Sequence, residues 1–194
     1  MPVSFFSTWT RTLMAAAVIA LAVWGLYGNM ASAVYPFLLG FFEWMETTWF
    51  GVIGKTWGAA FAFVEAIHLL GLAVLGGCVI ASDGRLLGLL LTDVDASTLF
   101  DRTHRVFVWA LSVLIFTGVF MACGVATKIY YLPVYWFKML ALIAGILFHF
   151  FIRRPLLQHE LDELNPVVTK LVAVASILVW LMVAATGRWI GFSG

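Results

Sequence analysis

The sequence predicts an all-α polytopic membrane protein, because its composition and its long apolar stretches do not fit a soluble globular domain. Of its 194 residues, 63% are hydrophobic and 11% are charged, whereas a soluble domain is about half apolar and about a quarter charged. Several apolar stretches approach or exceed the roughly 20 residues that a helix needs to cross a bilayer. The net charge of +1 comes without a basic face, which argues against binding to nucleic acid. No repeat or second domain is evident, so residues 1–194 form a single membrane domain in contact with the lipid bilayer.

We expect five transmembrane helices, of which spans 2–5 form a four-helix core. In chain order, the expected spans are residues 13–27, 57–81, 106–126, 134–152 and 167–189. The first follows Arg11 and precedes Ala31-Ser32-Ala33, a pattern that resembles a secretory signal with its cleavage site. We nevertheless expect this segment to be retained as the first span.

An interfacial amphipathic segment is expected at residues 35–56, between the first two spans. Pro36, the acidic pair Glu43 and Glu46, and Lys55 interrupt it, and most of its other large side chains are aromatic. Aromatic rings favour the boundary between bilayer and water, where an amphipathic helix lies flat. Two interpretations follow: an anchoring belt, or a surface for a protein partner or a second copy of the chain.

The distribution of lysine and arginine predicts the orientation of the chain in a bacterial inner membrane, because cytoplasmic loops are enriched in these residues. With the N-terminus cytoplasmic and the C-terminus periplasmic, the inner side carries more of them than the outer side. The inner set is Arg11, Arg85, Arg102, Arg105, Arg153, Arg154 and Lys170, and the outer set is Lys55, Lys128, Lys138 and Arg188.

Two ionisable residues, Glu65 and His68, lie near the middle of the second span. Residues three apart share one face of a helix, and Gly71 continues this stripe. An ionisable group at membrane depth costs roughly 2.5–3.5 kcal/mol on the insertion scale and is therefore seldom without a function. We expect this stripe to face a buried cofactor.

A second stripe lies on the fourth span, where Lys138, Ala141, Gly145 and His149 point in nearly the same direction. The alanine and the glycine leave a gap next to the histidine, as a flat macrocycle packed against a helix requires. Small residues have a second explanation, because they also let membrane helices approach one another closely.

The expected cofactor is a heme, and the resemblance given below implies that it is heme b. The candidate cofactor-binding residues are His68, His149, His104, Glu65, Lys138 and Gly145, with His68 and His149 as the metal ligands. His104 and His149 should lie at similar depth near several arginines, whereas His68 lies roughly 20 Å from the inner boundary at about 1.5 Å per residue. One heme on His68 with tilted helices, a His/Met heme, or two hemes at different depths therefore stay open, and copper is the alternative metal because imidazole also binds it.

These residues resemble the HemJ-type protoporphyrinogen oxidases, which are four-helix membrane bundles that bind heme b. The shared pattern is a histidine, two glycines and an arginine on one helix, then a lysine and a histidine eleven residues apart on a later helix. In this chain they are His68, Gly76, Gly77 and Arg85, then Lys138 and His149.

The copper-resistance CopD type and bacterial inner-membrane families of unknown function are also similar. The families of unknown function show an aromatic lead-in, then E-x-x-H-x-x-G and D-x-R-L-L-G, which fit Glu65 to Gly71 and Asp83 to Gly88 here. The resemblance covers roughly residues 41–153. This chain departs from the HemJ type in having a first span and an interfacial segment.

We therefore predict a membrane b-type cytochrome-like protein that holds heme between its helices for electron transfer. One alternative is a HemJ-like heme enzyme that oxidises a porphyrinogen or a quinol. The other is a non-redox metal permease or an accessory subunit of a larger membrane complex. The two cysteines are far apart along the expected bundle, which excludes a disulfide between them.

Overall fold

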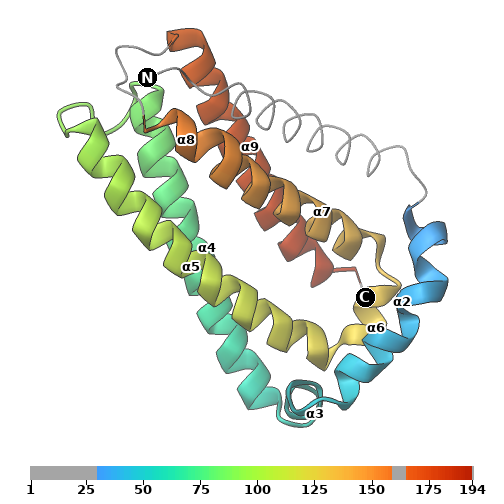
Figure 1. Ribbon diagram of the computed structural model, residues 1–194. Coiled ribbons are helices and arrows are strands. Elements are labelled where there is room, and N and C mark those ends of the chain that lie inside the picture. Colours follow the sequence, from blue (N-terminus) through green and yellow to red (C-terminus); the bar gives the residue numbers. More distant parts are fainter. Residues whose placement is uncertain (1–29, 159–164, 194) are drawn as a thin grey trace.

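The structure, a computed structural model, describes residues 30–158 and 165–193, and within these ranges the regular secondary structure is all helical. The expected first span and His159 lie outside the described residues. The elements are α2 (Met30–Thr47), α3 (Trp49–Thr56), α4 (Gly58–Leu86), α5 (Ala96–Gly124), α6 (Ala126–Tyr130), α7 (Pro133–Leu147), the π-helix η1 (Phe148–Arg153), α8 (Arg154–Leu156) and α9 (Pro166–Ile190) (Figure 1).

Four helices in the described part of the chain are long and apolar enough to cross a membrane. They are α4, α5, the continuous run Pro133–Leu156, and α9, which correspond to the last four expected spans. Many large apolar side chains on them point outward, including Trp109 and Phe116. This exposure fits a lipid environment, where an apolar outer surface carries no penalty.

The connection between α4 and α5 is shorter than the sequence suggested, since only residues 87–95 separate the two helices. Helix α5 begins at Ala96 because Asp95 caps it, its carboxylate accepting a hydrogen bond from the Thr98 amide at 2.8 Å. Hydrogen bonds from this backbone amide and from the Ser97 and Thr98 side chains lower the pKa of Asp95 to about 2. Helix α4 runs on to Leu86 because its polar residues Ser82 and Asp83 are buried in the bundle.

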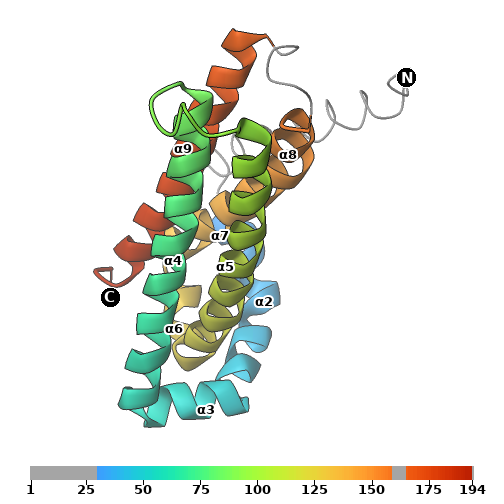
Figure 2. The same cartoon turned by 90° about the vertical axis from the view of Figure 1, so that its left-hand side faces the viewer.

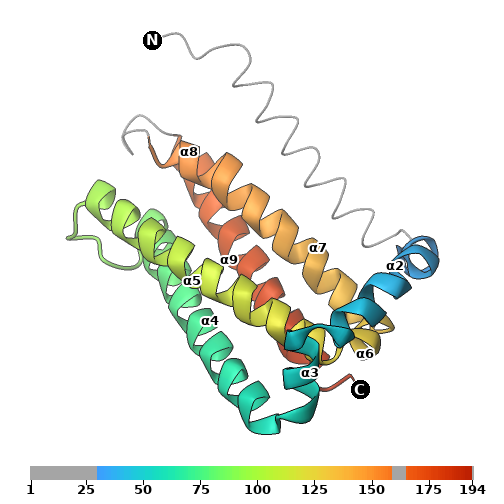
Figure 3. The ribbon, with the colours of Figure 1, turned by 60° about the horizontal axis from the view of Figure 1, so that its bottom comes forward.

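The membrane helices form two antiparallel pairs, α4 with α5 and α7 with α9, and α9 also packs against α4. Figures 1 and 3 show the two pairs inclined to one another. Leu75, Phe107 and Trp180 belong to one buried cluster that joins α4, α5, α7 and α9. We call the end with residues 87–95 and α8 the loop end, and the end with α3 and α6 the α3 end.

Helices α2 and α3 occupy the segment for which an interfacial element was expected, and α3 lies across the bundle at its end (Figure 2). Glu46 ties this segment to the bundle: its carboxylate forms an ion pair with Lys55 and accepts a 2.7 Å hydrogen bond from the Thr127 amide. Burial alone would raise the pKa of Glu46, but the hydrogen bonds from Lys55 and Thr127 outweigh it and lower that pKa. Trp49 stays 83% exposed, as either an anchoring belt or a docking surface would require.

Candidate functional site

Two sites at different levels of the bundle contain the histidines that the structure describes. The first, near the loop end, consists of Ser82, Asp83, His104, His149 and Arg153, and we call it the Arg153 cluster. The second, nearer the α3 end, consists of His68, Thr117, Gly118, Lys138 and Gly187, and we call it the His68 site. Along α4, His68 and Ser82 are 14 residues apart, about 21 Å at ~1.5 Å per residue.

The Arg153 cluster is built on a buried ion pair between η1 and α4. Arg153 donates to one oxygen of Asp83 through Nε at 2.9 Å and through Nη2 at 2.6 Å, and to the Ser82 hydroxyl at 2.7 Å. Arg153 is 5% exposed and Asp83 is fully buried. The second carboxylate oxygen, Oδ2, is buried without a hydrogen-bond partner among the described residues. The pair joins η1 to α4 through charges that compensate each other.

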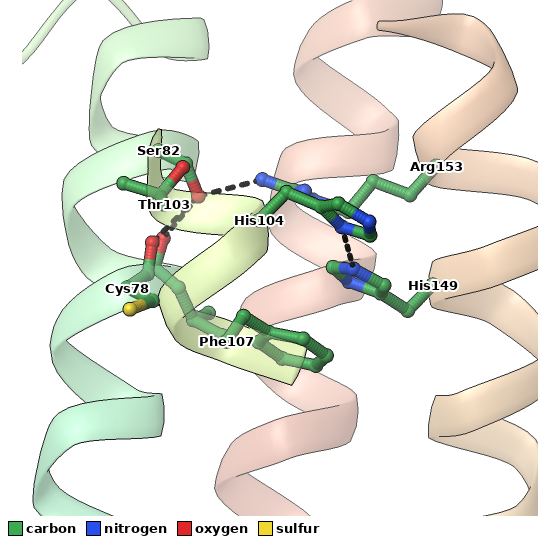
Figure 4. Close-up of a pocket in the computed structure, with 8 residues that line it drawn as sticks. Cys78, Ser82, Thr103, His104, Phe107, His149 and Arg153 are labelled. Carbon is green, nitrogen blue, oxygen red and sulfur yellow. Dashed lines mark hydrogen bonds between the residues drawn. The ribbon is translucent and has the colours of Figure 1, made fainter. Parts of the chain in front are cut away.

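His149 and His104 form a second contact in this cluster, with His104 Nδ1 and His149 Nε2 3.2 Å apart (Figure 4). The ring of Phe107 stacks on His149 with centroids 3.8 Å apart and an angle of 9° between the planes. Nδ1 of His149 is buried and finds no acceptor among the described residues. A proton is therefore best placed on Nε2, where it is donated to His104, because a buried N–H without an acceptor is rarely tolerated.

The local backbone explains why His149 and Arg153 both turn toward α4 and α5. Residues Phe148–Arg153 form a π-helix, and the Arg154 amide donates to the carbonyl of His149, five residues back. Pro155 follows and has no N–H to donate, so the α-helical hydrogen-bond pattern is interrupted at this point. π-Helical turns are rare in proteins, and those that occur are often found at functional sites.

The Arg153 cluster leaves little space for a cofactor. The cavity that it borders, lined also by Cys78, Thr103 and Phe107, has a volume of about 10 Å³. This is the space of about one water molecule. Its side chains are engaged with one another, since the guanidinium is neutralised by Asp83 and the histidines are hydrogen-bonded. A heme does not fit the cluster as it is arranged.

The His68 site differs because its imidazole bonds a hydroxyl group and not a second histidine. His68 Nδ1 lies 2.8 Å from the Thr117 hydroxyl, which already donates its only hydrogen to the Val113 carbonyl at 2.7 Å. With its hydrogen on the Val113 carbonyl, Thr117 accepts from His68, and this arrangement places the imidazole proton on Nδ1. Nε2 then carries a lone pair, and no hydrogen bond from the described residues occupies it. A histidine held in this way is typical of metal ligation, in which the second nitrogen bonds a neighbouring oxygen.

Glycines border this site on two sides. A Cβ atom at position 118 would lie 3.4 Å from Cε1 of His68, so α5 presents bare backbone to the ring. A Cβ atom at position 187 would lie 3.2 Å from Nζ of Lys138, so the amino group rests against α9 where only a glycine leaves room.

Lys138 is a cation without a counter-ion in the described part of the chain. The ion pairs found there join Lys55 to Glu46, Arg153 to Asp83 and Arg154 to Asp101. Lys138 lies within electrostatic range of His68, and Glu65 forms no ion pair with it. A half-buried ammonium group at membrane depth calls for an anion. A ligand with carboxylate groups, such as the propionates of a heme, would supply that charge.

A family of unknown function, DUF6644, matches residues 41–193 of the chain. The chain belongs to this family. The match agrees with the expected relation to membrane families of unknown function. No curated protein and no solved structure matches the chain.

The packing around Gly145 and Met182 bears on two further sequence expectations for this family member. The gap beside Gly145 is closed, because a Cβ atom there would meet Val179 at 3.0 Å and the Trp180 ring at 3.4 Å. Gly145 thus lets α7 and α9 approach, as small residues do in membrane bundles. Met182, which by its place in the last span should lie at about the depth of His68 and so was a candidate for the methionine of a His/Met heme, is 52% exposed and points outward.

The structure brings His104 and His149 together at similar depth, as expected, and places Lys138 near His68. It does not bring His149 to His68. Sequence reasoning missed Thr117 and the partnership of Asp83 with Arg153. Arg153 is 70 residues from Asp83 in sequence, and only the packing of the helices reveals that they pair.

Proposed function

We propose that the protein is a membrane b-type cytochrome in which His68 ligates heme b through Nε2. The observation that supports this most is the hydrogen bond between His68 and Thr117, whose own hydrogen is committed to Val113. It fixes the imidazole in the tautomer that leaves Nε2 available, and it increases the basicity of the ligand. When bound, the heme supplies one-electron transfer chemistry, with a potential that the axial ligand and its hydrogen bonds adjust.

The remaining residues of the His68 site would orient the heme and balance its charge. Lys138 offers an ammonium group to a propionate. The backbone at Gly118 and Gly187 lets the His68 ring and the Lys138 side chain lie close against α5 and α9. The Arg153 cluster, in this proposal, holds the loop end of the four helices together and carries no heme. One cofactor is therefore assigned to one histidine of this chain.

The test is the absorption spectrum of the purified full-length protein. A Soret band and a reduced α-band are expected, with about one heme per chain by pyridine hemochrome assay. A conservative Lys138→Met variant should keep the bands and bind heme less tightly, because the propionate loses its partner. A wild-type preparation that stays colourless after reconstitution with hemin would contradict the proposal.

A HemJ-like enzyme is the second candidate, favoured by the uncompensated charge of Lys138. In that case Lys138 would hold a carboxylate of a porphyrinogen substrate and not a propionate of the cofactor. Complementation of a strain without protoporphyrinogen oxidase distinguishes the enzyme from the cytochrome. Growth with the wild-type chain and none with Lys138→Met, at equal heme content, would favour the enzyme.

A further inference from the structure

Two arginines on α5 differ from the other arginines near the loop end, because they have no partner in the described part of the chain. Arg153 and Arg154 form ion pairs, and Nε of Arg85 donates to a backbone carbonyl at 3.3 Å. Arg102 and Arg105 are exposed, and neither takes part in a hydrogen bond or an ion pair with another described residue. Two guanidinium groups are therefore left for an anion.

The length of α5 places these arginines at the boundary between the hydrocarbon core and the lipid headgroups. With 29 residues, α5 is about 43 Å long and exceeds the hydrocarbon core of a bilayer, which is about 30 Å thick. From Arg105 to the end of α5 at Gly124, the helix rises about 28 Å. When Gly124 lies at one boundary of the core, Arg102 and Arg105 therefore lie at the other, at the level of the lipid phosphates.

An exposed stripe of α5 leads from these arginines into the hydrocarbon core. Its members are three or four residues apart, as on one face of a helix, and they are Arg102, Arg105, Trp109, Ser112 and Phe116. Trp109 is 76% exposed one turn below Arg105, and tryptophan rings favour the membrane interface. The last three members also line an open apolar groove of about 540 Å³ between α4 and α5.

The chemistry of the stripe matches the two parts of one lipid molecule. A phosphate group accepts strong hydrogen bonds from guanidinium groups such as those of Arg102 and Arg105. The groove below has no charged lining residue, and the Ser112 hydroxyl already donates to the Val108 carbonyl at 2.9 Å, so an acyl chain fills this groove without leaving a donor unpaired. A zwitterionic headgroup brings its own cation, which the arginines repel, so the stripe favours a lipid with a net negative charge.

We propose that this stripe of α5 binds a phospholipid whose headgroup is anionic. The phosphate accepts hydrogen bonds from Arg102 and Arg105, and one acyl chain passes Trp109 and lies in the groove. The groove at Ser112 is about 10 Å below Arg105, within the roughly 15 Å of hydrocarbon that belongs to one leaflet. The site goes beyond the proposed function and does not depend on heme.

The test is native mass spectrometry of the full-length protein in neutral detergent, titrated with phosphatidylglycerol or with phosphatidylcholine of the same acyl chains. Phosphatidylglycerol should bind more tightly, because phosphatidylcholine has no net charge. Each arginine near the surface contributes about fivefold, so Arg102→Gln with Arg105→Gln should weaken phosphatidylglycerol binding about 30-fold and affect phosphatidylcholine less. Lys128→Gln with Lys170→Gln is the matched control, because it removes the same charge from two other exposed positions, and it should change neither affinity.

Two further measurements separate the headgroup from the acyl chain. Ser112→Phe puts a ring into the groove and should weaken phosphatidylglycerol binding while the preference over phosphatidylcholine persists. Glycerol phosphate, which has the anionic group and no acyl chain, should not displace the lipid. Equal affinity for the two lipids, or equal effects of the arginine pair and the lysine pair, would overturn the proposal. Displacement by glycerol phosphate would assign the arginines to a soluble anion, and unchanged binding to Ser112→Phe would exclude the acyl chain from the groove.

Discussion

The Arg153 cluster and the His68 site both place imidazole groups inside a membrane bundle, yet they differ in how the cation beside the imidazole is balanced. In the Arg153 cluster the guanidinium, the carboxylate and the two rings are engaged with one another around a space for one water. In the His68 site, Nε2 and the Lys138 ammonium have no partner among the described residues. Each site leaves one imidazole nitrogen unpaired among the described residues, Nδ1 of His149 and Nε2 of His68, so neither membrane depth nor an unpaired nitrogen alone marks a ligand-binding histidine. The His68 site is distinguished by the ammonium group of Lys138, which has no counter-ion there.

The largest effect is expected from breaking the closed network. Arg153→Met leaves Asp83 buried without its counter-charge and should destabilise the protein by about 3–5 kcal/mol, measured by denaturant unfolding in detergent. The double variant Asp83→Leu with Arg153→Met should regain most of the lost stability, because no isolated charge remains buried.

The matched control for that prediction is Arg154→Met. Arg154 pairs with Asp101 at 2.9 Å, and the carboxylate is largely exposed, so the loss should be below about 1 kcal/mol. Equal effects of Arg153→Met and Arg154→Met would show that the Arg153 cluster does not hold the loop end together.

A smaller loss of stability is expected at the α7–α9 contact, which separates the two sites. Gly145→Ala adds a Cβ atom 3.0 Å from Val179 and should cost about 1–3 kcal/mol through overpacking. Gly76→Ala is the control, because a Cβ atom there meets nothing within 4 Å. Thermal unfolding should show a lower midpoint for Gly145→Ala alone. A gain of stability for Gly145→Ala would contradict the close packing of α7 on α9, because it would show that Val179 yields to the added methyl group.

The four described spans could be predicted from the sequence because length and hydropathy determine them, and the stripes of Glu65–His68 and Lys138–His149 followed from helical periodicity. The arrangement of the side chains inside the bundle could not be predicted from the sequence. Helix tilt and the π-turn before Pro155 decide that His149 meets His104, and neither can be read from spacing. The role of Gly145 was open for the same reason, since a glycine can admit a cofactor or a neighbouring helix.

The hydrogen bond between Thr117 and His68 provides a further test of the difference between the two sites. Thr117→Val removes the acceptor that fixes the tautomer and should weaken heme retention on the order of tenfold, measured by transfer of heme to apomyoglobin. Thr117→Ser keeps the hydroxyl and should behave like the wild type. Identical heme loss for both variants would exclude this hydrogen bond as the orienting contact.

The smallest effect concerns Asp95, which caps α5 at the loop end. Its pKa of about 2 lies below the unfolded value near 3.8, so its stabilising contribution is present above about pH 4 and is lost as the pH falls through 2. Hydrogen exchange at the first turn of α5 should increase in that window, with no change at His68. Asp95→Asn retains the cap and should abolish the pH dependence; a persistent dependence would assign it to another group.

Replacement of the proposed ligand tests the central claim most directly. His68→Gly should lose the Soret band, and free imidazole added to this variant should restore it by entering the vacated position. His149→Gly, measured in parallel, should keep the band without imidazole. A Soret band that survives in His68→Gly and disappears in His149→Gly would contradict the account and assign the heme to the Arg153 cluster.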